Sequence, residues 1–222
     1  MEGREAKDRL YDVFARTAKA LASPKRIELV ELLAQGEHTV ESLAQATGMG
    51  VTNTSAHLQV LSRSRLVETR KAGTRVFYRL SGDDVAAFVV ALRDLARSRL
   101  AEVDQVVRDY FMARDALEPV GRKELVARAG KGKVVVLDVR PAEEFAAGHI
   151  PGALSVPLDQ LDAALARLPK RAEIVAYCRG PYCVLAPQAV ERLRAKGYKA
   201  RRLAEGFPEW RLAGLPIASG EE

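Results

Sequence analysis

The apolar residues of this chain follow two different patterns, and the change falls near Pro119. Before this proline, apolar residues recur every three or four positions, which predicts amphipathic helices. After it, short apolar runs typical of buried strands alternate with helical segments, which predicts a mostly parallel sheet with helices on its faces. The sequence therefore predicts an α-helical first domain over residues 1–114, a linker over 115–121 and an α/β second domain over 122–222.

The first domain is expected to contain a helix-turn-helix. An amphipathic helix over residues 5–20 precedes a second helix that Ser23-Pro24 begins. Two short helices follow, opened by Thr39 and Thr52 and separated by Gly48. A pair of this kind places its second helix in the major groove of DNA. The inward side chains of that second helix and the following turn are expected to be Ala56, Leu58, Leu61 and Leu66.

A basic β-hairpin is predicted directly after these helices. Two β-like runs, 66–70 and 75–80, are joined by Lys71-Ala72-Gly73-Thr74, and six basic residues against one acid lie between Arg63 and Arg79. Helix and hairpin together predict a winged helix, in which the helix reads base edges and the hairpin holds phosphates. The residues expected to contact DNA are Thr52, Asn53, Thr54, Ser55, His57, Gln59, Arg63, Arg70, Lys71 and Arg75.

Four segments resemble the arsenic-repressor (ArsR) family of winged-helix transcriptional regulators: Leu21–Ile27, Ser55–Leu58, Leu66-Val67 and Gly73–Leu80. The resemblance implies a homodimer on a double-stranded DNA operator, released by an inducer. Metalloid-sensing members carry Cys-Val-Cys where this chain has Thr39-Val40-Glu41. The three histidines also offer no clustered ligand set, so we expect neither a metal site of the family's usual kinds nor a cofactor.

The segment from Asp83 to about Met112 carries apolar residues at helical spacing. This predicts a single helix of about 45 Å, at a rise of about 1.5 Å per residue. A small winged-helix domain cannot cover a helix of that length. A dimer partner or the second domain is expected to cover the remainder.

Both cysteines lie in one short loop of the second domain. A predicted strand ends at Tyr177 and a predicted helix begins at Val184, so the free N–H groups of that helix and the charge of Arg179 are expected to favour the thiolate of Cys178. Cys183 has two open interpretations: a thiol that resolves a modified Cys178, or a small buried apolar residue. The predicted active-site loop is Cys178, Arg179, Gly180, Pro181, Tyr182, Cys183 and Val184.

The second half resembles the rhodanese domain through Asp138–Phe145, Gly148–Ala153 and Gly206–Pro216. The resemblance implies a fold with a mostly parallel sheet and sulfurtransferase chemistry, with Cys178 as nucleophile and persulfide carrier. Cys183 stands where the pattern Cys-x-x-Gly-x-Arg has its arginine, which weakens the case for thiosulfate and favours a persulfide or polysulfide donor.

Five further residues of this half have structural interpretations. Asp138 and Arg140 have two open interpretations: an ion pair or cap that braces the fold, which is favoured, or a catalytic role. His149 is interpreted as a structural residue rather than a base. Phe207 and Trp210 are expected to be core anchors.

The two resemblances predict a DNA-binding repressor whose rhodanese-like domain senses reactive sulfur or redox state through persulfidation or oxidation of Cys178. An active sulfurtransferase with an attached DNA-binding domain is the alternative, and a silent partner-binding rhodanese is a third. Two cysteines form no disulfide framework, the first residues carry no secretory signal, and no apolar run is long enough to span a bilayer. We therefore expect a cytoplasmic protein with a small sulfur donor as its partner and no membrane contact.

Overall fold

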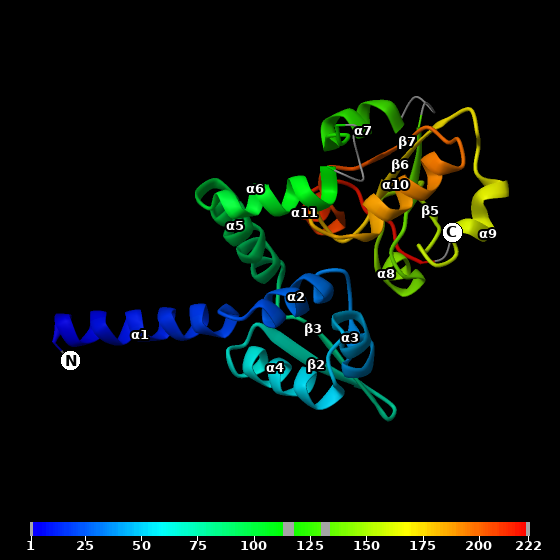
Figure 1. Ribbon diagram of the computed structural model, residues 1–222. Coiled ribbons are helices and arrows are strands. Elements are labelled where there is room, and N and C mark those ends of the chain that lie inside the picture. The colour runs from blue at the N-terminus through cyan, green and yellow to red at the C-terminus, as the bar shows by residue number, and fades with distance from the viewer. Residues whose placement is uncertain (1, 113–117, 130–133, 221–222) are drawn as a thin grey trace. The chain divides into compact units, whose positions relative to one another are not determined.

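The computed structural model describes residues 2–112, 118–129 and 134–220 (Figure 1). The chain forms two compact units, Met1–Val89 and Val90–Glu222. Residues 115–117 of the predicted linker lie outside the described residues. Within those described ranges, no helix is both long enough and apolar enough to cross a membrane.

The first unit is the predicted winged helix. A three-stranded antiparallel sheet of order β1-β3-β2 packs with the helices around one apolar core. The elements are α1 (Gly3–Leu21), α2 (Pro24–Leu33), β1 (His38–Thr39), α3 (Val40–Thr47), α4 (Val51–Arg63), β2 (Val67–Ala72), β3 (Arg75–Leu80) and the start of α5 (Asp83–Arg99).

Local sequence signals explain where these helices begin and end. Pro24 is the first residue of α2, as predicted, and the Thr39 hydroxyl accepts a hydrogen bond from the Ser42 backbone N–H at the start of α3. Gly48 ends α3 with φ 66°, a left-handed conformation that glycine adopts without strain. Helix α4 begins at Val51, one residue before the predicted position.

The buried face of α4 differs from the prediction at two positions. Thr54, Leu58 and Leu61 are buried, whereas Ala56 is exposed. The spacing of four and then three residues places these three side chains on one stripe of a helix, and Ala56 falls outside it. Thr54 tolerates burial because its hydroxyl donates a hydrogen bond to the Gly50 carbonyl oxygen at 3.1 Å. Thr54 is therefore a core residue and does not belong to the DNA-facing set.

The prediction of one long helix was wrong. Helix α5 ends at Arg99, Leu100 is extended with ψ 107°, and the chain continues as α6 (Ala101–Val106) and a π-helical segment η1 (Val107–Met112). No glycine or proline marks this break. The segment after the break packs within the second unit, where Phe111 is buried and its ring packs edge to face on that of Tyr182.

The second unit contains a four-stranded parallel sheet of order β5-β4-β6-β7. The helical segments between β5 and β6 are short, with α9 followed by one 3₁₀ turn. The elements are α7 (Arg122–Ala129), β4 (Val134–Asp138), α8 (Ala142–Ala147), β5 (Leu154–Ser155), α9 (Leu161–Ala164), η2 (Leu165–Arg167), β6 (Glu173–Tyr177), α10 (Leu185–Ala195), β7 (Ala200–Arg202) and α11 (Phe207–Leu212).

Strand β6 shows how this sheet forms two cores. Ile174 and Ala176 face α9 and α10 on one side, while Val175 and Tyr177 face α7, α8 and α11 on the other. This alternation follows from the two-residue period of a strand. The next residue on the first face is Cys178, so the nucleophile lies at the carboxyl end of a strand with helices on both faces, the usual ligand-binding edge of such sheets.

Candidate functional site

The site begins with Cys178, which directly follows β6 and precedes the loop to α10. Its side chain is only 3% exposed. The thiol donates weak hydrogen bonds to the carbonyl oxygens of Cys183 at 3.7 Å and Gly180 at 3.8 Å. Both donor–acceptor contacts close the loop on itself, so Cys178 and Cys183 are neighbours in space as well as in sequence.

The two thiols ionise as a linked pair. Burial raises the pKa of Cys178 well above its ordinary value, and a hydrogen bond between the two thiol side chains raises it further. The same hydrogen bond, with the backbone N–H groups of Leu185 and Arg179, lowers the pKa of Cys183 to about 7. Ionisation of the pair is therefore favoured at Cys183 over Cys178.

This distribution of charge corrects the expectation that the thiolate is favoured at Cys178. The positive charge of Arg179 is offset by Glu144, because the guanidinium forms a bidentate ion pair with that carboxylate at 2.6–3.1 Å. Glu144 is 1% exposed, and a buried carboxylate needs a cation beside it. Burial is therefore the largest influence on the pKa of Cys178, and it raises that pKa.

The loop is closely packed against α11. A Cβ atom on Gly206 would lie 2.3 Å from the Gly180 backbone nitrogen, so only glycine fits at position 206. The carboxylate of Glu209 accepts a hydrogen bond from the Gly206 N–H at 3.0 Å and forms an ion pair with Arg93 of α5. These contacts fix the position of the loop relative to α5 and α11.

A buried polar network braces the strand ends next to the loop. Arg140 and Asp138 form an ion pair at 2.5 Å with both side chains fully buried, and Tyr177 donates its hydroxyl proton to Asp138 at 2.5 Å. Burial and the Asp138 charge raise the pKa of Tyr177, which therefore stays protonated. Arg140 also donates to the Gly148 carbonyl oxygen at 2.7 Å. The expected ion pair between Asp138 and Arg140 is present.

His149, Phe207 and Trp210 are structural residues, as predicted. His149 is buried, stacks on the ring of Phe145 at 3.7 Å and hydrogen-bonds the Phe145 carbonyl oxygen through Nδ1. Phe207 and Trp210 belong to the core beneath α11. In the described part of the chain, no three His, Cys, Asp or Glu side chains are grouped as a metal ion would require.

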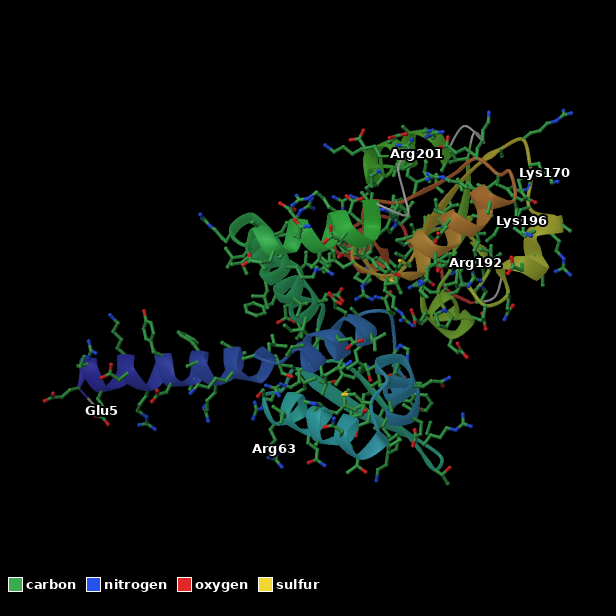
Figure 2. The ribbon with its side chains drawn as sticks, in the orientation of Figure 1. Glu5, Arg63, Lys170, Arg192, Lys196 and Arg201 are labelled. Atoms are coloured by element: carbon green, nitrogen blue, oxygen red, sulfur yellow. The ribbon has the colours of Figure 1, made fainter. Side chains whose placement is uncertain are left out.

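The second candidate surface is the helix and hairpin of the first unit. Thr52, Asn53, Gln59 and Arg63 are exposed on α4, while Ser55 and His57 are partly buried. Figure 2 shows Arg63 at the end of this helix. Strands β2 and β3 pair with Ala72 opposite Arg75, and Gly73 with φ 60° makes the tight turn between them.

The basic residues of the hairpin differ in their surroundings. Arg70 forms an ion pair with Glu37 at 2.5 Å and lies over the ring of Phe77. Lys71 and Arg75 are exposed and have no salt bridge among the described residues. The hairpin tip therefore presents positive charge to solvent.

Sequence reasoning missed three residues that hold the loop: Glu144, Arg93 and Glu209. Glu144 lies within the segment that resembles rhodanese, but nothing in its spacing indicates that it would pair with Arg179, 35 positions away. Arg93 and Glu209 are 116 positions apart and belong to different halves of the chain. No sequence pattern predicts a pairing of that kind.

Comparison with known proteins identifies both halves. The family model for "Bacterial regulatory protein, arsR family" matches residues 23–69, and that for "Rhodanese-like domain" matches residues 121–213. The HTH-type transcriptional regulator Rv0324 of Mycobacterium tuberculosis is 46% identical over 216 residues, covering 97% of this chain and 95% of that protein.

Other similar proteins match part of the chain. A sulfurtransferase of Allochromatium vinosum is 34% identical over 89 residues, or 40% of this chain and 81% of that protein. A biofilm growth-associated repressor of Xylella fastidiosa is 38% identical over 89 residues, or 40% of this chain and 78% of that protein. The solved homodimeric winged helix-turn-helix domain of Mb0332 from Mycobacterium bovis is 45% identical, covers 45% of this chain and 91% of its own, and has a TM-score of 0.41.

Proposed function

The chain belongs to the ArsR-family transcriptional regulators that carry a rhodanese-like domain, and from this premise we propose that it is a repressor that senses reactive sulfur or redox state at Cys178. One observation carries the proposal: both cysteines share the loop after β6, where the Cys178 thiol hydrogen-bonds the Cys183 carbonyl oxygen at 3.7 Å. A thiol with a thiolate beside it is suited to accept sulfur and then to be oxidised.

The first step transfers one sulfur atom from a persulfide donor, R–S–SH. The sulfur of Cys178 attacks the outer sulfur of the donor while its proton passes to the Cys183 thiolate. The S–S bond of the donor breaks and its electron pair leaves on R–S⁻. The products are Cys178–S–SH, a protonated Cys183 and the donor thiolate, so atoms and charge balance without another reactant.

A second step is available because Cys183 is adjacent. After it loses its proton to water, the Cys183 thiolate attacks the inner sulfur of Cys178–S–SH, and HS⁻ leaves with the electron pair of the broken bond. The loop then holds a Cys178–Cys183 disulfide. Either product changes the charge and the packing of a loop whose two thiols are otherwise closely surrounded.

DNA binding is assigned to α4 and the hairpin. Thr52, Asn53 and Gln59 present hydrogen-bonding groups on the exposed face of α4, and Lys71 and Arg75 provide phosphate contacts. A homodimer is supported by α1, where Leu10, Tyr11, Val13 and Phe14 are 45–61% exposed. An apolar stripe of this size on a helix is typical of a protein–protein interface.

Helix α5 supports a route from the loop to the DNA-binding unit. Its first turns place Val85 and Val89 in the core of the first unit, and Arg93, one turn later, forms the ion pair with Glu209 beside the loop. A change in loop packing at Gly180 would displace Gly206 and Glu209, because these residues are in close contact with the loop. The same helix therefore carries residues of both units.

The test is operator binding by the full-length protein, with an operator selected from a random duplex library. We expect sodium tetrasulfide to change the affinity of the wild type at least tenfold and to leave Cys178→Ser unchanged. Cys183→Ser separates the two steps, because it can form the persulfide but no disulfide, and intact mass in the same samples reports which product is present. An equal response of wild type and Cys178→Ser contradicts the sensor.

An active sulfurtransferase is a second candidate, favoured by the similarity of this chain to a sulfurtransferase of Allochromatium vinosum and by the place of Cys178 directly after β6. It predicts many turnovers per protein with a persulfide donor and cyanide as acceptor. A single sulfur per Cys178 and no further turnover supports the sensor instead.

A further inference from the structure

An apolar cavity of about 630 Å³ lies within the second unit, next to the cysteine loop. Val103 and Val106 of α6, and Tyr110 and Phe111 of η1, line one side of it. Its volume is that of pockets which hold small organic molecules, about 300–1,000 Å³. The sulfur-transfer steps proposed at Cys178 do not use this cavity.

The loop itself forms another wall of the cavity. Tyr182 and Val184, which flank Cys183 in the chain, both line it. Tyr182 is held in place by the ring of Phe111, with centroids 6.3 Å apart, and by the guanidinium of Arg93 over its face at 5.8 Å. An occupant of the cavity therefore lies against the segment that carries the reactive thiols.

The lining is unsuited to an inorganic anion. Its surface is almost entirely apolar, and its two charged residues are Arg93 and Glu102. The guanidinium of Arg93 is engaged by the carboxylate of Glu209, and Glu102 would repel an anion. Thiosulfate would therefore gain little there, whereas an aliphatic or aromatic group would be desolvated favourably.

The helix that lines the cavity has an unusual conformation. Segment η1 makes six residues of π-helix, a form that is rare and occurs frequently at functional sites. The conformation is tied to the sulfur site, because the Tyr110 hydroxyl accepts a hydrogen bond at 3.2 Å from Gln188 of α10, the helix that begins after the loop. The π-helix and its hydrogen bond to α10 are independent of the apolar lining, and both lie at this cavity.

We propose that this cavity binds the apolar organic group of the sulfur donor, so that the physiological donor is an organic persulfide, R–S–SH with an aliphatic or aromatic R. The proposal rests on the function proposed above and narrows its substrate. The R group occupies the space between η1 and Tyr182, and its persulfide end is presented to the Cys178–Cys183 pair. The transfer follows the balanced step already given, with R–S⁻ as leaving group.

The first test compares donors on the full-length protein, with persulfidation of Cys178 followed by intact mass. Ethyl, butyl and hexyl persulfides are expected to react faster as the chain lengthens, by up to about fourfold per methylene that enters the cavity. Sodium tetrasulfide, which has no organic group, provides the baseline. Equal rate constants for ethyl and hexyl persulfide overturn the proposal.

A matched pair of variants locates the effect. Val106→Glu places a charge at the cavity, and Val126→Glu places the same charge on α7, whose Val126 does not line it. Both side chains are already exposed, at 62% and 48%, so both variants are expected to fold. Val106→Glu should slow hexyl persulfide at least fivefold and leave tetrasulfide within twofold, and Val126→Glu should match the wild type for both donors. Equal loss in both variants contradicts the assignment.

A binding measurement separates this proposal from the sensor function. Hexyl methyl sulfide cannot transfer sulfur, and its binding to Cys178→Ser is observed by saturation-transfer NMR. Binding to Cys178→Ser that is lost in Cys178→Ser/Val106→Glu supports the cavity even if no donor modifies Cys178, in which case only the sensor fails. Absence of binding, with a weaker homodimer for Val106→Glu, overturns the proposal and assigns the cavity to contact between two copies of the chain.

Discussion

Three basic residues of the winged helix and two beside the cysteine loop have opposite surroundings. In the winged helix, Arg63, Lys71 and Arg75 are exposed, and no salt bridge involves them within the described residues. In the rhodanese-like unit, Arg140 and Arg179 are paired with the buried carboxylates of Asp138 and Glu144. Unpaired surface charge suits a polyanion that releases counterions on binding, whereas paired buried charge holds a site rigid. The formal net charge of +6 does not distinguish exposed cations from cations paired with buried carboxylates.

The largest expected effect comes from breaking a buried pair. Arg140→Ala leaves the fully buried carboxylate of Asp138 without its cation, and we expect a loss of about 3–5 kcal/mol in the free energy of unfolding. Urea denaturation followed by circular dichroism measures it. Arg63→Ala, the matched change of an exposed arginine, should leave the midpoint unchanged. Similar midpoints for the two variants would remove the contrast between the units.

The second prediction concerns the pairing of Arg179 and its effect on the thiols. Because the pKa of Cys183 is lowered to about 7 and that of Cys178 is raised, Cys183 should be alkylated first. The thiolate form of Cys183 is lost as pH falls below 7, so its labelling by iodoacetamide should be about tenfold slower at pH 6 than at pH 8. Peptide mass spectrometry at each pH identifies the labelled residue. Faster labelling of Cys178 at pH 7 would indicate that Arg179 favours its thiolate after all.

The third prediction concerns the hairpin tip. Lys71→Ala removes an exposed cation that is expected to contact a phosphate. Affinity should therefore fall about fivefold for every DNA sequence tested, and the slope of log affinity against log salt concentration should decrease in magnitude by about one. Fluorescence anisotropy over a range of salt concentrations measures both quantities. Arg79→Ala is the control, since Arg79 already pairs with Glu68 at 3.0 Å. A larger loss for Arg79→Ala would place the phosphate contact elsewhere on the hairpin.

The smallest expected effect sharpens the comparison within the winged helix. Arg70 lowers the pKa of Glu37 through their hydrogen-bonded ion pair, and this carboxylate offsets the charge of the hairpin. Glu37→Gln should release that charge and raise operator affinity about twofold, with little change in stability because the pair is exposed. The same anisotropy titration detects it. A decrease in affinity would indicate that Glu37 is needed to orient Arg70 on DNA.

Much of the fold follows from local signals in the sequence. Pro24, Thr39 and Gly48 mark helix ends because each satisfies or removes a backbone group that a helix end leaves unpaired. The apolar run Glu173–Tyr177 becomes β6 at the predicted residues. No such signal marks the break at Leu100, and the segment after it packs through Phe111 on Tyr182, a residue far along the chain.

The sequence by itself determined that this chain joins a winged helix to a rhodanese-like domain, and that both its cysteines share one loop. Periodicity, helix caps and motif spacing depend on residues that are close in sequence, so they can be recognised before the fold is known. Only the tertiary structure decided how the loop is charged, because Glu144 reaches Arg179 across 35 positions and burial then raises the pKa of Cys178. Ionisation depends on what surrounds a group in space, and the order of residues along the chain does not specify those surroundings.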